Sequence, residues 1–328
     1  MTNSRKALVV GIDEYPVNSL RGCVNDAKDI AALLSRDADL SVNFSVQLKT
    51  SENFDIDKPT LKKWIAECFK GDDEVALFYF SGHGQIDEKG GYIVTPDYSP
   101  GDWGISMEEI LTIANNSECQ NKVIILDCCH SGSVGAINTM GQKTAVIKEG
   151  VTILTASKFD ETAAEINGHG VFTALLTDAL KGGAADITGN ISPGSIYAYI
   201  DRALGPWQQR PVFKTNVKSF VSLRKSAAPI DISVVRKITE YFSAPNIKLP
   251  LNPSFEPTNN KSTPHKVVKP YSDEDNVAVF ADLQKLEGVG LVVPDGEEHM
   301  YYAAMNSKSC RLTSIGQHYW RLVKEGRI

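Results

Sequence analysis

Two residues able to do nucleophilic chemistry follow apolar segments of this 328-residue chain. Cys129 comes just after the run Val-Ile-Ile-Leu-Asp at 123–127, and His83 comes just after Val-Ala-Leu-Phe-Tyr-Phe at 75–80. An imidazole near a thiol lowers the pKa of the thiol and can later give a proton to a leaving amine. A Cys and a His at two strand ends are therefore typical of covalent catalysis by a thiolate.

Each of these residues has a simpler interpretation when taken alone. A buried Cys is usually a small apolar side chain, and a lone His is usually structural. His130 is a rival base, but its side chain should diverge from that of its neighbour Cys129, and Cys128 should point to the opposite side. Because His83 and Cys129 both stand at strand ends beside glycines, the pattern favours the catalytic interpretation.

The elements that must position these residues alternate along the first two thirds of the chain. Strands are predicted at 6–12, 44–48, 74–80, 122–127 and 151–156, with a short edge strand at 92–94 and a last strand at 219–223. Helices are predicted at 25–34, 60–69, 106–115, 172–181 and 193–204. This alternation predicts an α/β fold, a mainly parallel sheet with helices on both faces. In such sheets the chemistry gathers outside the carboxyl ends of the strands.

Composition limits the class of protein. A hydrophobic content of 42% and a charged content of 23% are ordinary for a globular protein, and the length suits two domains. A net charge of −6 argues against a protein devoted to nucleic acid. The apolar segment 7–12 is too short for a signal or a membrane span. Six cysteines, two of them adjacent and none in a CxxC pair, indicate reduced thiols, so we expect a cytoplasmic protein.

The residues around His83 and Cys129 carry a specific family resemblance. Residues 78–84 read Phe-Tyr-Phe-Ser-Gly-His-Gly, and residues 126–132 read Leu-Asp-Cys-Cys-His-Ser-Gly. These segments resemble the two signature motifs of caspase-like cysteine peptidases of the bacterial metacaspase type. Their separation, 129 − 83 = 46 residues, resembles the spacing in the caspase clan. The resemblance covers about residues 5–225.

This resemblance implies a caspase-like fold and an endopeptidase mechanism. Cys129 is the expected nucleophile, and His83 is the expected base and proton donor. The backbone N–H groups of Gly84 and Cys129 are expected to form the oxyanion hole. The chemistry requires no cofactor.

The resemblance also implies a substrate preference. In metacaspases the first specificity pocket is lined by residues that match Cys23, Asp26, Ser81 and Asp127 of this chain. Two carboxylates in a partly enclosed pocket attract a long cation, and a guanidinium can bind them through two N–H groups. We therefore expect cleavage of protein substrates after Arg, with Lys second, rather than after Asp. Asp26 has a second interpretation, the capping of the helix that it begins, and both roles can coexist.

The loop 133–150 lies where family members are often processed. Lys143 and Lys148 are candidate self-cleavage sites for a peptidase that cuts after basic residues. A solvated loop explains the two lysines equally well.

A cluster of acids follows the strand predicted at 151–156 and is compatible with regulation by calcium. Asp160, Glu161 and Glu165 resemble acids that bind calcium in some metacaspases. They lack the alternating oxygen spacing of a dedicated calcium loop, so solvated acids are the alternative. His169 lies at a loop-to-helix junction that resembles one of the family, and we expect it to be structural.

The pattern changes after about residue 225. Residues 226–272 hold seven of the 15 prolines, which is typical of a linker or strap, with one helix at 233–242. Residues 273–328 predict a helix, a strand, a second strand at 300–304 and a closing helix, a pattern that resembles a winged-helix module. Its basic residues do not form the dense stripe of a nucleic-acid binder, so we expect a regulatory or recruitment domain that binds a protein.

Two hypotheses from different classes follow. The first is a cysteine endopeptidase that cleaves after Arg or Lys; similar proteins in bacteria commonly act in stress, defence or cell death. The second is a catalytically silent caspase-fold scaffold, or a DNA-tethered adaptor, that acts through the C-terminal module. The intact His83/Cys129 pair and the acidic pocket favour the first hypothesis.

Overall fold

The chain folds into two compact units, Met1–Ala227 and Ala228–Ile328. The structure is a computed structural model, which describes residues 4–128, 146–156, 165–166, 168–204, 211–262 and 267–328. The first unit ends two residues beyond the predicted boundary at residue 225. No helix among the described residues combines the length and the apolar character that crossing a membrane requires.

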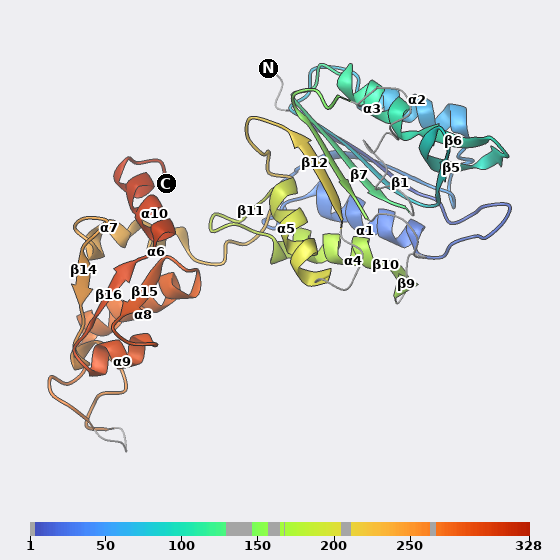
Figure 1. The fold of residues 1–328 in the computed structure, drawn as a ribbon. Coiled ribbons are helices and arrows are strands. Elements are labelled where there is room, and N and C mark those ends of the chain that lie inside the picture. The colour runs from blue at the N-terminus through green and yellow to red at the C-terminus, as the bar shows by residue number, and fades with distance from the viewer. Residues whose placement is uncertain (1–3, 129–145, 157–164, 167, 205–210, 263–266) are drawn as a thin grey trace. The chain divides into compact units, whose positions relative to one another are not determined.

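A six-stranded sheet in the order β12-β8-β7-β3-β1-β2 forms the centre of the first unit (Figure 1). Its strands are β1 (Arg5–Gly11), β2 (Ser45–Thr50), β3 (Val75–Ser81), β7 (Asn121–Asp127), β8 (Val151–Thr155) and β12 (Val212–Asn216). All neighbours pair in parallel except β12, which runs antiparallel to β8 at the edge. Burial on both faces explains why the parallel strands read as continuous apolar runs.

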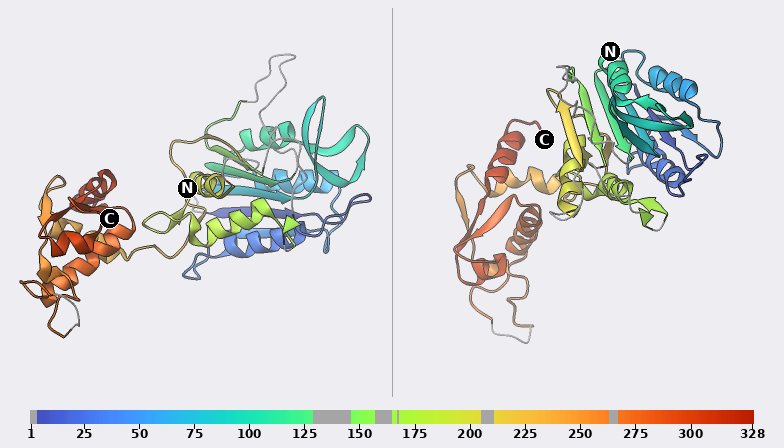
Figure 2. Two further views of the ribbon diagram at one scale, coloured as in Figure 1. Left: turned by 60° about the horizontal axis from the view of Figure 1, so that its bottom comes forward. Right: turned by 45° about the vertical axis from the view of Figure 1, so that its right-hand side comes forward.

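Helices cover both faces of this sheet (Figure 2). One face carries α2 (Lys58–Cys68) and α3 (Met107–Asn115), and the other carries α1 (Cys23–Ser35), α4 (Val171–Asp178) and α5 (Pro193–Leu204). Successive side chains of a strand point to opposite faces. Tyr79 of β3 therefore packs with α1 and α4, whereas Phe80 packs with α2 and α3. The predicted α/β fold, mainly parallel with helices on both faces, is confirmed.

β3 and β7 are direct neighbours, and their register brings Ser81 beside Asp127. The N–H of Gly82 donates to the carbonyl oxygen of Asp127 at 3.3 Å, which extends the pairing by one residue. The two strands therefore end at the same level on one edge of the sheet. The offset of this register, 127 − 81 = 46 residues, equals the separation of His83 and Cys129.

The first unit differs from the predictions in two strands. The short edge strand predicted at 92–94 is part of β5 (Gly90–Ser99), the central strand of a separate antiparallel sheet with β4 (Gly84–Asp87) and β6 (Asp102–Ser106) that follows β3. Its strands are mostly half-buried, so they lack a continuous apolar run. In place of a strand at 219–223, β12 closes the main sheet. The shorter elements are β9 (Glu165–Ile166), β10 (His169–Gly170), a π-helical turn (Ala179–Gly183), β11 (Asn190–Ile191) and β13 (Arg224–Lys225).

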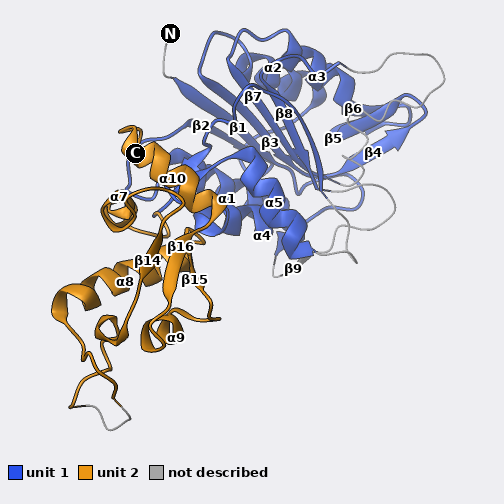
Figure 3. Ribbon diagram, turned by 60° about the vertical axis from the view of Figure 1, so that its left-hand side comes forward, with its two compact units in different colours: residues 1–227 blue, residues 228–328 orange. Residues whose placement is uncertain are grey.

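The second unit contains a three-stranded antiparallel sheet in the order β14-β16-β15, coloured orange with the rest of the unit in Figure 3. Its helices are α6 (Ile232–Arg236), α7 (Ile238–Tyr241), a 3₁₀ turn (Pro253–Phe255), α8 (Glu274–Gly288), α9 (Met300–Met305) and α10 (Ser314–Lys324). Its strands are β14 (Lys248–Pro250), β15 (Val292–Asp295) and β16 (Ser309–Leu312).

The structure differs from two predictions for this part of the chain. The expected linker 226–272 folds into the unit, because β14 pairs with β16 and Trp320 Nε1 donates to the carbonyl oxygen of Phe242 at 2.6 Å. The expected strand 300–304 is helix α9, which connects β15 to β16. The winged-helix module stays a prediction.

Candidate active site

His83 stands two residues beyond β3, at the carboxyl edge of the sheet. Its Nε2 lies 2.6 Å from the carbonyl oxygen of Asn18, and its ring centroid lies 4.5 Å from that of Tyr15. A carbonyl oxygen can only accept a hydrogen bond, so Nε2 carries the hydrogen. Nδ1 is then the nitrogen that can exchange a proton with a thiol.

The loop between β1 and α1 supplies both contacts. The Tyr15 side chain is buried; its hydroxyl accepts a hydrogen bond from His83 N at 3.0 Å and donates one to Val94 O at 3.3 Å. Burial raises the pKa of Tyr15 well above its ordinary value, so the hydroxyl stays neutral. Sequence reasoning missed both residues. The one local signal is at Asn18, whose φ of +58° lies in the left-handed region that Asn tolerates.

Tyr15→Phe is expected to loosen His83. The substitution leaves the partly buried His83 N–H and the buried Val94 carbonyl without the hydroxyl between them, which costs about 1–2 kcal/mol of stability. A shifted imidazole should lower kcat by about tenfold, because proton transfer depends on fixed geometry. Thermal melting and peptide kinetics measure the two effects. A variant that melts lower but keeps its kcat would show that Tyr15 supports the fold alone.

A cavity of about 160 Å³ opens beside His83. Gly84, a predicted oxyanion residue, lines it with Val17, Asn18, His83, Gln85, Val94, Tyr98 and Trp103. Gly82 has no room for a side chain, because an added Cβ would lie 2.6 Å from Tyr15 Oη. His83 and Gly84 thus face a hollow large enough to admit part of a substrate.

Cys129, the predicted nucleophile, lies outside the described residues, as does His130. The strand that leads to it, β7, is described to its end. Cys128 is 3% exposed and packs in the core cluster of Ile124 and Leu126, on the face covered by α2 and α3. The same cluster contains Tyr15, which contacts His83. That Cys128 points to the side opposite Cys129 stays a prediction.

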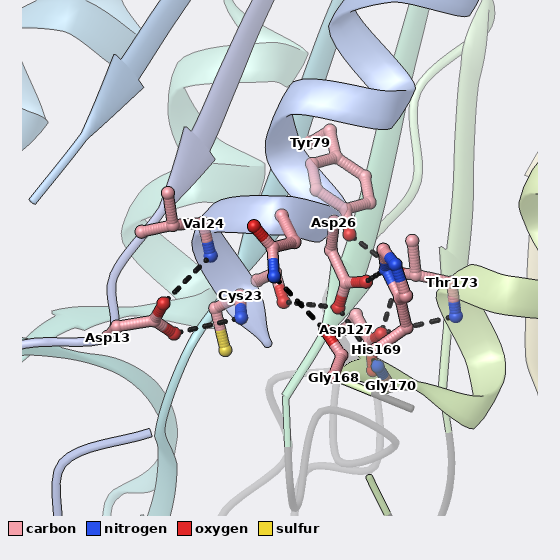
Figure 4. A network of polar contacts seen from close by, with 12 residues as sticks. Asp13, Cys23, Val24, Asp26, Tyr79, Asp127, Gly168, His169, Gly170 and Thr173 are labelled. Atoms are coloured by element: carbon pink, nitrogen blue, oxygen red, sulfur yellow. Dashed lines mark hydrogen bonds and ion pairs between the residues drawn. The ribbon is translucent and has the colours of Figure 1, made fainter. Parts of the chain in front are cut away.

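The residues predicted to line the specificity pocket lie together at the same edge, on the face covered by α1 and α4 (Figure 4). All are buried: Cys23, Asp26, Ser81 and Asp127. Ser81 Oγ donates to Asp26 Oδ2 at 3.4 Å, and Cys23 begins α1 one turn before Asp26. Burial raises the pKa of the Cys23 thiol, so this thiol stays protonated.

The start of α4 holds the two carboxylates. Gly170 N donates to Asp26 Oδ2 at 3.1 Å, while Thr173 donates to Asp127 Oδ2 from N at 3.2 Å and from Oγ1 at 2.6 Å. An added Cβ on Gly170 would lie 2.7 Å from Asp127 Oδ2 and 3.3 Å from Asp26 Oδ2. The two carboxylates therefore approach the same glycine. Tyr79 Oη, 2.6 Å from Thr173 Oγ1, completes the chain of donors.

Both carboxylates have raised pKa values. Burial raises the pKa of Asp127 to about 6, with a further contribution from the charge of Asp26 and an opposing one from the Thr173 hydrogen bonds. Burial also raises the pKa of Asp26, against the hydrogen bonds from His169 and Gly170. Two buried carboxylates side by side destabilise each other's charge, and a cation placed between them relieves this.

Two further residues belong to the cluster, Asp13 and His169. The sequence indicated no role for Asp13, and His169 was expected to be structural. Asp13 accepts hydrogen bonds from Cys23 N at 2.8 Å and Val24 N at 3.4 Å, and thereby caps α1. The capping role considered for Asp26 is therefore wrong, and the Asp26 side chain faces the cluster. His169 Nδ1 lies 2.9 Å from Asp26 Oδ1.

The candidate processing and calcium residues fall largely outside the described residues. This applies to Lys143, Asp160 and Glu161, and to the side chain of Glu165. Lys148 is exposed, and its backbone is held by hydrogen bonds to Asn115 Oδ1 at 3.0 Å and from Val151 N at 3.3 Å. Among the side chains that the structure describes, no group of three or more His, Cys, Asp or Glu is arranged to hold a metal ion.

Comparison with known protein families gives a match that lies within the first unit. A family model described as the caspase domain matches residues 4–221. Metacaspase-2 of Trypanosoma brucei brucei (strain 927/4 GUTat10.1) is 32% identical over 149 residues, which are 39% of this chain and 42% of that protein. Metacaspase-1 of Meyerozyma guilliermondii is 29% identical over 163 residues, 44% of this chain and 39% of that protein. The chain thus spans about two fifths of the length of these relatives.

A solved structure also resembles the chain. The crystal structure of caspase-1 from Spodoptera frugiperda aligns with a TM-score of 0.49 and 12% sequence identity. The alignment covers 69% of this chain and 92% of that structure.

Proposed function

The chain belongs to the caspase domain family, and from this premise we propose that it is a cysteine endopeptidase that cleaves protein substrates after Arg, with Lys second. His83 and Cys129 form its catalytic dyad. The unit Ala228–Ile328 serves as a regulatory or recruitment module that binds a protein partner.

In the proposed reaction His83 accepts and returns one proton in each of two stages, the formation of the thioester and its hydrolysis. Nδ1 takes the thiol proton of Cys129, and the thiolate attacks the carbonyl carbon of the cleaved bond. The N–H groups of Gly84 and Cys129 donate to the oxyanion that forms. The C–N bond then breaks as His83 returns its proton to the leaving amine. Water, deprotonated by His83, hydrolyses the thioester and regenerates the thiol.

The hydrogen bond from His83 Nε2 to Asn18 O supports the assignment of Nδ1 as the nitrogen that accepts and returns the proton. It fixes the tautomer in which Nδ1 has a lone pair, and it stabilises the imidazolium that forms when Nδ1 takes the proton. The carbonyl of Asn18 thus takes the part that a carboxylate plays in other dyads and triads, without a charge of its own.

The single observation that carries the substrate preference is the pair of buried carboxylates. Asp26 and Asp127 are 1% and 8% exposed, both approach Gly170, and burial raises the pKa of each. Such a pair is stabilised by a positive charge, and the planar guanidinium of Arg offers donors to both carboxylates at once. The ammonium of Lys supplies the charge with a less suitable geometry. An Asp side chain would add a third negative charge, so we expect Asp peptides to be poor substrates.

The test is a set of fluorogenic peptides that differ only in the residue before the cleaved bond: Arg, Lys, Gln or Asp. We expect kcat/KM to be highest for Arg, lower for Lys and at least 100-fold lower for Gln and Asp, about 3 kcal/mol of discrimination. Hydrolysis confined to the Asp peptide would contradict the preference. Absence of hydrolysis in all four, with the protein folded, would favour the scaffold hypothesis.

Self-processing is a separate part of the proposal. Purified protein incubated alone should release fragments whose new ends follow a basic residue, Lys143 or Lys148. The backbone of Lys148 is held to Asn115 and Val151, whereas a peptidase binds its substrate as an extended strand, so cleavage there requires local opening. Sequencing of the fragment ends identifies the bond.

A further inference from the structure

His169 covers one oxygen of the carboxylate pair (Figure 4). Its Nδ1 lies 2.9 Å from Asp26 Oδ1, and its side chain is 33% exposed, whereas that of Asp26 is 1% exposed. A carboxylate oxygen accepts, so Nδ1 carries the hydrogen of this bond. The imidazole therefore lies between solvent and Asp26, where a cationic group of a substrate would have to arrive.

The backbone around His169 is held by contacts that do not involve its imidazole. Gly168 O accepts a hydrogen bond from Asn25 Nδ2 at 3.4 Å, and Gly170 N donates to Asp26 Oδ2 at 3.1 Å. Gly170 is also the N-cap residue of α4. Rotation of the His169 side chain would thus free Asp26 Oδ1 while the segment stays in place.

We propose that the imidazole of His169 competes with the substrate's basic side chain: it occupies the place of that side chain on Asp26 and is displaced by it. This inference rests on the proposed cleavage after Arg or Lys. A guanidinium brings a full charge and two coplanar N–H donors, so it replaces the single N–H of the imidazole with a net gain. An uncharged side chain offers no such gain and leaves His169 on Asp26.

The displacement requires only a small free energy. When the imidazole is neutral, its contact with Asp26 is one hydrogen bond, and water reaches the imidazole over a third of its surface. Loss of one such bond changes an equilibrium by roughly three- to tenfold. We expect the imidazole to weaken the binding of basic substrates by this factor, and to keep Asp26 hydrogen-bonded when the pocket is empty.

The experiment compares His169→Ala with His169→Asn. Alanine removes the competing N–H, so KM for the Arg and Lys peptides should fall by roughly three- to tenfold while kcat stays within about twofold. Asparagine keeps an N–H close to the position of Nδ1, so its KM should stay near the wild-type value. A KM that is unchanged or raised in His169→Ala would overturn the proposal; a raised KM would mean that His169 positions Asp26 for binding.

A binding measurement separates this inference from the proposed peptidase activity. Agmatine, a guanidinium joined by a four-carbon chain to an ammonium group, is titrated by calorimetry into Cys129→Ala with and without His169→Ala. The dissociation constant should fall by the same roughly three- to tenfold in the double variant. Equal dissociation constants overturn the role of His169. A wild-type protein that fails to cleave Arg peptides counts against the proposed function alone, because the agmatine ratio still decides the role of His169.

Discussion

Cys129→Ala is expected to abolish peptide hydrolysis and to leave the fold intact. Loss of the nucleophile of a covalent mechanism removes roughly 10⁴-fold or more of kcat. His83 would then have no thiol to deprotonate, and water would be the only attacking group. The measurement is hydrolysis of the Arg peptide, with thermal melting to show that the variant folds.

The neighbouring Cys128 provides a matched control. Cys128 is 3% exposed in the core on the face covered by α2 and α3, so Cys128→Ala should cost about 1 kcal/mol of stability and leave kcat nearly unchanged. The two substitutions remove the same atom from adjacent residues with opposite results. Activity retained in Cys129→Ala, or lost in Cys128→Ala with the fold preserved, would reverse the assignment of the nucleophile.

Thiol labelling gives a second readout of the same assignment. The described cysteines are buried, and burial raises the pKa of the thiols of Cys23, Cys68 and Cys310. Buried protonated thiols react slowly with iodoacetamide. Native protein should therefore take up one label quickly, at Cys129, and Cys129→Ala should take up none on that timescale. Rapid labelling of the variant would show another reactive thiol.

Asp127→Asn is expected to change activity and stability in opposite directions. The substitution removes one of the two charges that bind the substrate cation, so kcat/KM for the Arg peptide should fall by roughly 100-fold or more. The amide oxygen of Asn can still accept both hydrogen bonds from Thr173. The folded protein loses a buried charge while its hydrogen bonds persist, so the variant should melt at a higher temperature at pH 7.

The pH dependence of this stability follows from the pKa of Asp127. That pKa is raised to about 6 from an ordinary 3.8, so the folded state binds the proton more tightly than the unfolded state. The stability that this group contributes is therefore complete below pH 3.8 and is lost as the pH rises to about 6. The loss amounts to about 3 kcal/mol. The gain in melting temperature of Asp127→Asn should be largest near pH 7 and should vanish near pH 4.

Melting curves of wild type and variant at both pH values, with Arg-peptide kinetics at pH 7, measure this prediction. Asp26 faces the same segment, and its charge contributes to the raised pKa of Asp127, so removal of the Asp127 charge also makes Asp26 easier to ionise. The difference between the two melting curves therefore measures the coupled pair of carboxylates. A lower melting temperature for Asp127→Asn at pH 7, without a specific loss for Arg peptides, would make Asp127 a structural residue.

The candidate site divides into residues that sequence alone predicts and residues that it does not. His83 could be chosen because strand ends are visible as the last residues of apolar runs, and because parallel strands end on one edge. Asp26, Ser81 and Asp127 could be chosen only through the resemblance to metacaspases, which implies the residues of the specificity pocket. Asn18 could not be chosen, since it acts through a backbone carbonyl that every residue has. Asp13 and His169 act across the fold, so only the tertiary structure shows their partners.

Periodicity could have corrected one error in the second unit. The apolar run 300–304 suggests a strand by its two tyrosines, but Met300, Ala303 and Ala304 are the residues that α9 buries. Spacings of three and four residues are those of a helix face, whereas a strand with one buried face would bury every second residue. The proline-rich segment before it gave no such signal, because its pairing partner β16 lies some 60 residues ahead in the sequence.

The register of β3 and β7 fixes how their ends lie beside each other across the sheet, but it does not fix the number of residues between those ends along the chain. Across the sheet, the ends of the two strands are fixed by backbone pairing from Val75 to Ser81. Along the chain, they are joined by an excursion through β4, β5, β6 and α3, whose β5–β6 turn is exposed at Gly101. The excursion can grow or shrink at that turn without moving either end. The 46-residue interval is therefore a measure of loop length, and a relative with a different interval can carry the same site.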